Sequence, residues 1–275
     1  MQNSVEKYLR TEKLPHIWCA GCGNGIVLGA MVRAFEKMGC NQNNTVIVSG
    51  IGCSSRAAGY MDFNTLHTTH GRALAFATGI KMAKPGIDVF VIMGDGDAAS
   101  IGGNHLIHAA RRNIDLTAII FNNQIYGMTG GQYSPLTPPG SIATTAPYHT
   151  IERNFDLPEL ARVAGATYVA RGTTYHAAML TNLITAGAAH KGFSLIEVVT
   201  ACPVSFGRRN KMGSAYDMLM WQKEQAVSVK KAKSMTPEEM QGKFVIGELY
   251  KGAAPEYTEV YDRLIEKAQG KSEEE

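Results

Sequence analysis

The sequence has few charged residues, no excess of either charge sign and no long apolar run. Asp, Glu, Lys and Arg make up 19% of the 275 residues, and 27 basic against 24 acidic side chains give a formal net charge of +3. So small an excess argues against nucleic acid or an anionic membrane as the main partner. No run of about 18 apolar residues occurs, so the chain is not expected to span a membrane.

The N-terminus lacks the apolar segment of a secretory signal. It reads MQNSVEKYLRTEK, which is polar throughout. The predicted compartment is therefore the cytoplasm. Thiols stay reduced there, so the five cysteines are expected to be ligands, catalysts or core residues rather than disulfide partners.

Apolar segments of strand length alternate with segments of helical pattern. The expected strands cover residues 45–50, 89–93, 116–121 and 193–199. The expected helices cover residues 71–84, 101–112 and 174–190, with one more that begins after Asp156 and ends at Gly165. This alternation predicts an α/β fold, a doubly wound parallel sheet with helices on both faces.

The pattern changes after Pro203. Residues 212–233 are charged and methionine-rich and predict a helix, whereas residues 237–268 contain two short segments without a sheet pattern. The tail KSEEE is expected to be disordered. We therefore expect an α/β domain over residues 1–200 and a C-terminal extension over residues 201–275 that packs on the domain or on a partner.

Polar residues follow two of the expected strands. Gly94-Asp95-Gly96 comes directly after one strand, and Asn122-Asn123 ends the next. In a parallel sheet both strand ends open onto the same edge, where ligands bind. The Asp95 carboxylate, the Asn123 amide oxygen and the Ile125 carbonyl would suit Mg²⁺ and leave room for a diphosphate. Either motif alone could be an ordinary turn, and only their combination predicts this site.

A glycine-rich segment follows immediately. It runs Gly127-Met128-Thr129-Gly130-Gly131. Glycines in such a loop let backbone N–H groups approach phosphate oxygens. The segment therefore extends the predicted diphosphate site.

Four of the five cysteines could converge on that edge. Cys19 and Cys22 form a C-x-x-C, and Cys53 and Cys202 each follow an expected strand. Four cysteines suit a [4Fe-4S] cluster or a structural zinc ion, and spacing alone does not separate the two. A lone C-x-x-C could also be a redox pair, and Cys53 or Cys202 alone could be a small buried residue. Cys40 has no motif and is assigned to the core.

The order of the motifs adds a resemblance. WCAGCG, IGCS, HGR, GDGD, NNQIYGMTGGQ and CPVSFGRRN follow one another between about residues 15 and 212. In this the chain resembles the β subunits of 2-oxoacid:ferredoxin oxidoreductases. The resemblance implies Mg²⁺ ligands at Asp95, Asn123 and Ile125, and one [4Fe-4S] cluster on Cys19, Cys22, Cys53 and Cys202. The thiamine diphosphate contacts that it implies are Ile51, Gly52, Cys53, Ser54, His70, Gly96, Asp97, Gly127, Met128 and Thr129. For His70 the alternative is a structural histidine of the loop.

The resemblance also implies a reaction and partners. These are oxidative decarboxylation of a 2-oxoacid, coenzyme A as acyl acceptor, ferredoxin as electron acceptor, and an α subunit that supplies the pyrimidine-binding domain, with room for further small iron–sulfur subunits. Neither nucleic acid nor membrane is an expected partner. The alternatives are a non-redox thiamine lyase or synthase and a zinc-bound scaffold subunit.

The predicted substrate is 2-oxoglutarate, because the run of motifs resembles 2-oxoglutarate enzymes more closely than pyruvate enzymes. Arg56 follows Cys53 by three residues, and its guanidinium would bind the distal carboxylate through two hydrogen bonds. Met128 would form an apolar wall of the substrate pocket. The alternatives are that Arg56 pairs only with Asp62 or the diphosphate, and that the same chemistry acts on pyruvate or branched-chain 2-oxoacids.

Overall fold

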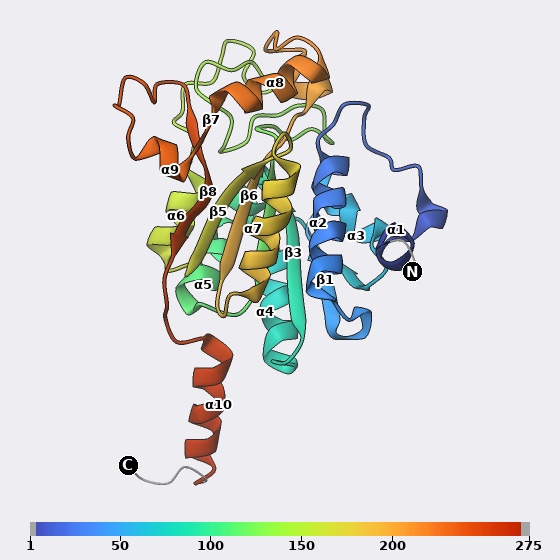
Figure 1. Cartoon of the computed structure of the whole chain (residues 1–275), viewed down its shortest axis with the longest axis vertical. Helices are drawn as coiled ribbons and strands as arrows, with labels where there is room; N and C mark the ends of the chain where they lie inside the picture. Colours follow the sequence, from blue (N-terminus) through green and yellow to red (C-terminus); the bar gives the residue numbers. More distant parts are fainter. Residues whose placement is uncertain (1–3, 271–275) are drawn as a thin grey trace.

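Helices cover both faces of one sheet in the computed structural model, which describes residues 4–270 (Figure 1). The strands are β1 (Thr45–Ser49), β2 (Asn64–His67), β3 (Asp88–Gly94), β4 (Thr117–Asn122), β5 (Tyr168–Thr173), β6 (Ser194–Val199), β7 (Ala226–Ser228) and β8 (Phe244–Lys251). Their order is β2-β1-β3-β4-β6-β5-β8-β7, and every neighbouring pair is parallel except β5 and β8. The predicted doubly wound parallel sheet is confirmed.

Alternate strand residues face two separate cores. In β3, Phe90 and Ile92 pack in a core with helices α2 (Asn24–Met38), α3 (Ala57–Tyr60) and α7 (Ala177–Ala189). Val91 and Met93 pack in the other core with helices α4 (Ala73–Ala83), α5 (Gly103–Arg112) and α6 (Leu157–Ala164). Because both faces are covered, the strands read as continuous apolar runs.

Helix α6 begins and ends where the sequence predicted. The Asp156 side chain accepts a hydrogen bond from the backbone N–H of Glu159 at 3.4 Å, and Gly165 ends the helix at φ 114°. A side-chain acceptor at the start and a left-handed glycine at the end satisfy backbone groups that the helix leaves open. The helix predicted between Asp156 and Gly165 is thereby confirmed.

The segment after residue 200 differs from expectation. It contains α8 (Ala215–Gln225), β7, α9 (Val229–Ala232), β8 and α10 (Tyr257–Ala268), so the helix expected over 212–233 ends at Gln225. The prediction that residues 237–268 lack sheet structure is wrong, because β8 pairs with β5. A register shift between Val169 and Ala170 interrupts this pairing, and such a bulge breaks the period-2 pattern by which a strand is recognised. The division at residue 200 stays a prediction.

Three further strands, β2, β5 and β7, were not predicted from the sequence, and β7 lies within the helix expected over 212–233. β2 is short and largely exposed, and β5 contains Arg171 and Gly172. The expected helix over 101–112 begins at Gly103, after a π-helical turn over Asp97–Ile101. π-helical turns occur often at functional sites.

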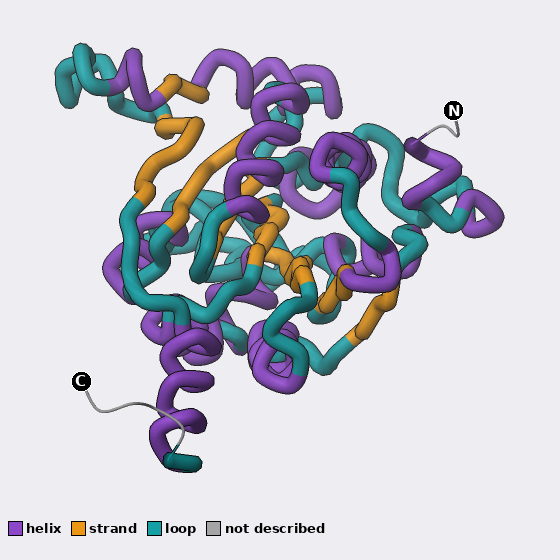
Figure 2. Tube along the Cα trace, turned by 60° about the horizontal axis from the view of Figure 1, so that its bottom comes forward, coloured by secondary structure: helices purple, strands orange, loops and turns teal. Residues whose placement is uncertain are grey.

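Helix α10 projects from the body of the chain in both views (Figures 1 and 2). Thr258 is its one buried residue. None of the described helices is long and apolar enough to cross a membrane. The tail KSEEE, expected to be disordered, lies outside the described residues.

Asn113 joins several elements at the amino edge of the sheet. It ends α5 at φ 50° and is 4% exposed. Its side-chain oxygen accepts hydrogen bonds from Phe193 N (2.9 Å) and Thr167 Oγ1 (2.7 Å), and its amide nitrogen donates to the carbonyls of Ala254 (3.1 Å) and Pro255 (3.3 Å). One amide therefore connects α5, the starts of β5 and β6, and the segment before α10.

The variant Asn113→Ala should lower the free energy of unfolding by about 2–5 kcal/mol. A left-handed alanine costs about 1–2 kcal/mol, and a buried N–H without a partner costs about 1–3 kcal/mol. Chemical denaturation measures the difference. Asn182→Ala is the control, since Asn182 accepts a hydrogen bond from Lys37 on the exposed surface, and a change within about 0.5 kcal/mol is expected. Equal losses in the two variants would contradict the role of Asn113.

Candidate active site

A cavity of about 100 Å³ opens at the carboxyl ends of β1, β3 and β4. These strands are parallel neighbours, with Ser49 opposite Ile92 and Gly94 opposite Phe121, so the segments that follow them leave the sheet at one edge. The cavity is lined by all of the predicted Mg²⁺ and thiamine diphosphate contacts, namely Ile51, Gly52, Cys53, Ser54, His70, Asp95, Gly96, Asp97, Asn123, Ile125, Gly127, Met128 and Thr129. The structure thus brings these residues together, and their roles as ligands stay predictions.

Asp95 is a buried carboxylate without a cationic partner among the described residues. It is 2% exposed, and its Oδ2 accepts a hydrogen bond from the Ser134 hydroxyl. Burial raises the pKa of Asp95 to about 7, and hydrogen bonds from Ser134 and nearby backbone amides counter part of this rise. A divalent cation with further oxygen ligands from Asn123 and Ile125 would stabilise the ionised form.

Asp97 fixes His70 at the cavity. Its Oδ1 accepts hydrogen bonds from Gly71 N at 2.7 Å and from His70 Nδ1. With Nδ1 so engaged, Nε2 of His70 is the nitrogen available to a ligand. A Cβ on Gly50 would lie 1.8 Å from Asp97 Oδ2, so this position requires glycine.

Two buried oxygen atoms beside the cavity have no hydrogen-bond partner among the described residues. They are Asp97 Oδ2 and Ser54 Oγ. Unpaired buried polar atoms are costly, and in native proteins each calls for an explanation. A polar ligand in the cavity would supply the missing partners.

The loop from Tyr126 to Gly131 closes one side of the cavity. The Tyr126 hydroxyl donates to the Gly96 carbonyl at 3.0 Å, and a Cβ on Gly96 would lie 2.2 Å from the Tyr126 ring. The Gly131 N–H donates to the Tyr126 carbonyl at 2.9 Å. Glycine at position 96 therefore permits the close contact between the GDG turn and this loop.

Two cysteines flank the same loop. A Cβ on Gly127 would lie 3.3 Å from Cys202 Sγ and 3.9 Å from Cys53 Sγ. The Trp18 indole N–H donates to the Cys53 carbonyl at 2.7 Å, which ties the C-x-x-C segment to the Cys53 loop. Two separate strand ends and the N-terminal segment thus meet beside the cavity.

The other two motif cysteines lie in the same neighbourhood. Burial raises the pKa of the Cys22 thiol to about 11, and the thiols of Cys202, Cys53 and Cys19 add to this rise. All five cysteines are free, and within residues 4–270 no group of three or more His, Cys, Asp or Glu side chains is arranged to hold a metal ion. Cys40 lies apart from the others, near the strand starts at Asp88 and Thr117.

Arg56 and Met128 differ in their placement. Arg56 is exposed and is not among the lining residues of the cavity, although its charge lowers the pKa of Cys53 against the larger rise caused by burial. Asp62, its suggested partner, instead pairs with Arg10 at 3.6 Å. Met128 is 43% exposed and lines the cavity. The substrate roles of Arg56 and Met128 stay predictions.

Sequence reasoning missed several residues that shape this cavity. Ser134 lies in a proline-rich loop and carries no local signal for its contact with Asp95. Gly71 lies in the HGR segment, and its N–H reaches Asp97 across 26 positions of the chain. Tyr126 lies within the NNQIYGMTGGQ motif, whose length could have indicated a functional role for this residue.

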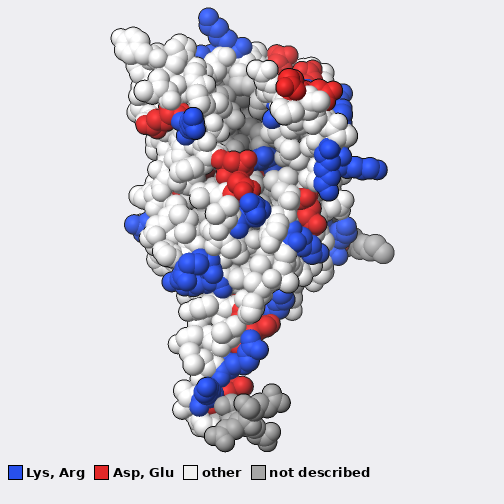
Figure 3. Space-filling model, turned by 90° about the vertical axis from the view of Figure 1, so that its left-hand side faces the viewer, with Lys and Arg blue, Asp and Glu red and all other residues white. Residues whose placement is uncertain are grey.

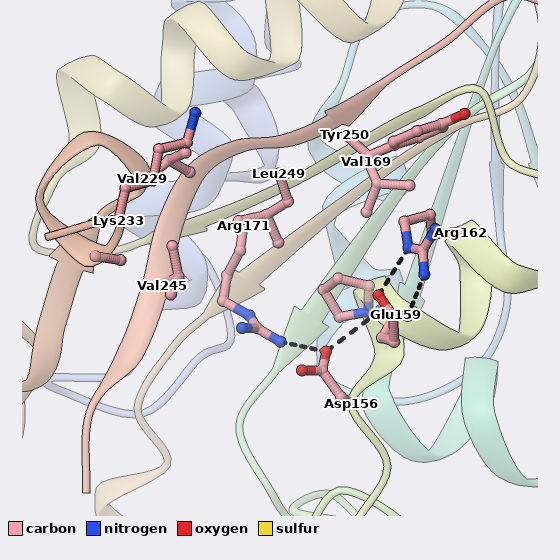
Figure 4. Close-up of a pocket in the computed structure, with 12 residues that line it drawn as sticks. Asp156, Glu159, Arg162, Val169, Arg171, Val229, Lys233, Val245, Leu249 and Tyr250 are labelled. Atoms are coloured by element: carbon pink, nitrogen blue, oxygen red, sulfur yellow. Dashed lines mark hydrogen bonds and ion pairs between the residues drawn. The ribbon is translucent and has the colours of Figure 1, made fainter. Parts of the chain in front are cut away.

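A larger groove of about 450 Å³ lies elsewhere, between α6, β5, β8 and α9 (Figure 4). Its apolar wall includes Val169, Val245 and Leu249, and its charged residues include Asp156 and Arg171. Figure 3 shows a hollowed face of the molecule on which acidic and basic side chains lie close together. None of the predicted site residues lines this groove. We therefore do not assign the active site to it, although it is larger than the cavity at the carboxyl ends of the strands.

Comparison with known proteins finds a matching family model and relatives of high identity. The family model described as "Thiamine pyrophosphate enzyme, C-terminal TPP binding domain" matches residues 19–198. The chain is 54% identical, over 98% of its length and 95% of the relative, to the 2-oxoglutarate synthase subunit KorB of Methanothermobacter marburgensis. It is also 54% identical to the protein of that name in Methanocaldococcus jannaschii, over 95% of this chain and 97% of the relative.

A solved structure extends the likeness to the fold. It is described as 2-oxoglutarate:ferredoxin oxidoreductase from Magnetococcus marinus with 2-oxoglutarate, coenzyme A and succinyl-CoA bound. It matches with a TM-score of 0.87 and 33% identity, over 98% of this chain and 91% of that chain. The likeness therefore includes the sheet and the segments at its carboxyl edge.

The pKa of Asp95 predicts a pH-dependent effect on stability without metal or cofactor. Burial raises this pKa from 3.8 to about 7, so the protonated form favours folding, and that contribution is lost as pH rises from about 4 through about 7. Asn does not titrate. The free energy of unfolding of Asp95→Asn should therefore rise relative to that of the parent, by up to about 4 kcal/mol, as the pH increases from 4 to 8. Urea denaturation across this range measures the difference. A difference that does not change with pH would show that Asp95 is not a desolvated carboxyl.

Proposed function

We propose that this chain, which belongs to the thiamine pyrophosphate enzymes and among them to the beta subunits of 2-oxoacid:ferredoxin oxidoreductases, acts in the coenzyme A-dependent oxidation of 2-oxoglutarate to succinyl-CoA. The observation that carries the proposal is the convergence of the GDG, NN and glycine-rich segments on one cavity. It occurs in a chain 54% identical to a 2-oxoglutarate synthase subunit over 98% of its length. The compartment proposed is the cytoplasm.

Asp95, Asn123 and Ile125 are the proposed Mg²⁺ ligands. Asp95, Asn123 and Ile125 line one cavity, and hard oxygen ligands such as their side-chain and carbonyl oxygens are those that Mg²⁺ prefers. Asp95 is buried and has only a hydroxyl and backbone amides as partners. A metal held here would neutralise Asp95 and hold the diphosphate through its remaining coordination positions.

The remaining lining residues would hold thiamine diphosphate. The thiazolium ring supplies the decarboxylation chemistry when the cofactor is bound. Backbone N–H groups of Gly127, Met128 and Thr129 would face phosphate oxygens. His70, fixed through Nδ1 by Asp97, would present Nε2 to the same region. These groups bind and orient the cofactor at the edge of the sheet.

Cys19, Cys22, Cys53 and Cys202 are the proposed ligands of one [4Fe-4S] cluster. The support is that Cys53 and Cys202 lie beside Gly127 at the cofactor cavity, and that Cys202, Cys53 and Cys19 are close enough to raise the pKa of Cys22. Cys53 also lines that cavity, so a cluster held by these cysteines would supply electron-transfer chemistry directly beside the cofactor, with ferredoxin as the electron acceptor. Zinc is the alternative metal for four cysteines.

The complete active site requires a second chain in this proposal. Thiamine enzymes need a carboxylate on the aminopyrimidine nitrogen, and no segment of this sequence resembles the domain that supplies it. An α subunit would supply it, and small iron–sulfur subunits are further candidate partners. The test is turnover by the purified complex with a panel of 2-oxoacids, coenzyme A and a low-potential dye. Failure to turn over any of them would reject the proposal.

The cluster assignment predicts the iron content of variants. Anaerobically purified protein should contain about four irons and four sulfides per chain, as this cluster type requires. Cys202→Ala should lose the stable four-iron cluster, because one thiolate ligand is gone. Cys40→Ala is the matched control and should keep the full iron content. A full, stable cluster in Cys202→Ala, or one zinc and no iron in the parent, would reject the assignment.

The substrate assignment predicts a selective loss in Arg56→Met. The KM for 2-oxoglutarate should rise about 30- to 150-fold, which corresponds to the roughly 2 to 3 kcal/mol of one charged hydrogen-bonded contact. The KM for pyruvate and 2-oxobutyrate should change little, because these substrates lack the distal carboxylate. Arg153→Met changes an exposed arginine outside the cavity and serves as control. An equal rise for all substrates would show that Arg56 serves the cofactor.

A further inference from the structure

A second buried carboxylate lies one strand away from the metal-binding turn. Glu197 on β6 is 2% exposed. Its Oε1 accepts a hydrogen bond from the Asn122 amide nitrogen at 2.8 Å. Asn122 ends the neighbouring strand β4 and directly precedes Asn123, one of the proposed Mg²⁺ ligands. The contact thus connects the interior of the sheet to that turn.

The other oxygen of Glu197 is bound to Arg171 on the strand beyond. Arg171 Nε lies 2.5 Å from Glu197 Oε2, and Arg171 also donates to Asp156 Oδ1 at 2.8 Å. Figure 4 shows the bond from Arg171 to Asp156 at the wall of the larger groove. The Arg171 side chain is 12% exposed, so the pair with Glu197 is largely withdrawn from water.

This pair is poorly explained as a source of stability alone. Replacing a buried ion pair by apolar residues of similar volume is often neutral or stabilising, because desolvation offsets the attraction. In the Glu197–Arg171 pair, one carboxylate oxygen is left to bind Asn122. A function at Asn122 therefore explains a carboxylate at this position better than packing does.

The turn after Asn122 needs support. Gln124 has φ 63°, a left-handed conformation that is unfavourable for a residue other than glycine. Its backbone N–H is held by the Asn122 side-chain oxygen at 3.1 Å, and its carbonyl by the Thr137 hydroxyl at 2.5 Å. Gln124 lies between Asn123 and Ile125, so its conformation decides where both proposed ligands point.

The orientation of the Asn122 amide follows from Glu197. A carboxylate beside a guanidinium can only accept hydrogen bonds, so Asn122 must turn its NH₂ group toward Glu197. The amide oxygen then faces the Gln124 N–H. A neutral Gln at position 197 could present either an acceptor or a donor, and the amide would lose this fixed orientation.

We propose that Glu197 is a positioning residue for the metal site: held by Arg171, it orients Asn122, which holds the strained turn that presents Asn123 and Ile125 to Mg²⁺. This inference rests on the proposed Mg²⁺ site and adds a group that never touches the metal. Residues that orient metal ligands in this way typically contribute about 10- to 100-fold to metal affinity.

The test uses the purified complex and measures Mg²⁺ affinity, with Mn²⁺ as the paramagnetic probe in competition with Mg²⁺. Glu197→Gln and Glu197→Asp should each raise the Kd for Mg²⁺ about 10- to 100-fold. Glu197→Asp keeps the charge and shortens the reach to Asn122, so it carries the test if Glu197→Gln fails to assemble. At saturating Mg²⁺ and thiamine diphosphate, kcat should stay close to that of the parent, because the reacting groups are intact.

A reciprocal exchange separates orientation from general damage. Asn122→Asp alone places two carboxylates together and should weaken Mg²⁺ binding. The double variant Asn122→Asp/Glu197→Gln restores one donor and one acceptor with their positions exchanged, and should recover an affinity close to that of the parent. A merely structural role for Glu197 predicts no such recovery.

The matched control is a buried ion pair away from the cavity. Lys81 Nζ lies 2.7 Å from Asp115 Oδ2. Asp115→Asn should lower the unfolding midpoint without changing the Kd for Mg²⁺. The positioning role is overturned if both Glu197 variants bind Mg²⁺ as the parent does, or if the double variant binds no better than Asn122→Asp.

The same experiment distinguishes the two levels of the proposal. Asp95→Ala removes a proposed ligand itself and should abolish Mg²⁺-dependent thiamine diphosphate binding. If Asp95→Ala leaves that binding intact, the metal site is misassigned. If Asp95→Ala abolishes it and the Glu197 variants bind as the parent does, the metal site stands and only the positioning role fails.

Discussion

The burial of carboxylates at the carboxyl edge of the sheet and in the strand beside it is the constraint on which the rest of this structure depends. Asp95, Asp97 and Glu197 are each 2% exposed, and a buried charge is costly unless it is paired or hydrogen-bonded. Each of these carboxylates has different partners. Asp97 binds His70 and the Gly71 N–H, Glu197 binds Arg171 and Asn122, and Asp95 has only the Ser134 hydroxyl and backbone amides. Asp95 is the carboxylate that the described chain leaves without a cation, and it is the one that a metal would complete.

Local sequence patterns predict those structural features that depend on residues close together in the chain. The buried strands β3 and β4 were visible because both faces of each are covered and their residues are continuously apolar. Asp156 and Gly165 could be recognised because helix caps use specific side chains at fixed positions. From these, the topology of parallel sheets brings Asp95 and Asn123 to one edge without further information.

The parts that could not be predicted depend on contacts distant in sequence. Strand β8 belongs to the sheet through its pairing with β5, and a bulge removes the alternation that would have revealed it. Ser134 reaches Asp95 across 39 positions, and Asn122 reaches Glu197 across 75. A serine in a loop and a glutamate in a strand carry no local mark of such partners. For the same reason the cysteine motifs indicate ligand types, whereas the fold decides which of the five lie together.

Buried polar side chains near the two ends of the strands are paired to different degrees, although Thr45 Oγ1 at the start of β1 also lacks a partner among the described residues. Near the strand starts, Lys81 binds Asp115 and the Ile87 carbonyl, and every polar atom of the Asn113 side chain has a partner within the chain. At the carboxyl edge, Asp97 Oδ2 and Ser54 Oγ are buried without one among the described residues. Completing such bonds within the chain would add stability, because unsatisfied buried groups are costly. Leaving such groups unpaired keeps donors and acceptors available for a ligand. A ligand that binds them then stabilises the folded protein. In the proposed function the unpaired oxygens beside the cavity would be completed by the cofactor, and the hydrogen bonds of Asn113 support the fold that holds these oxygens in place.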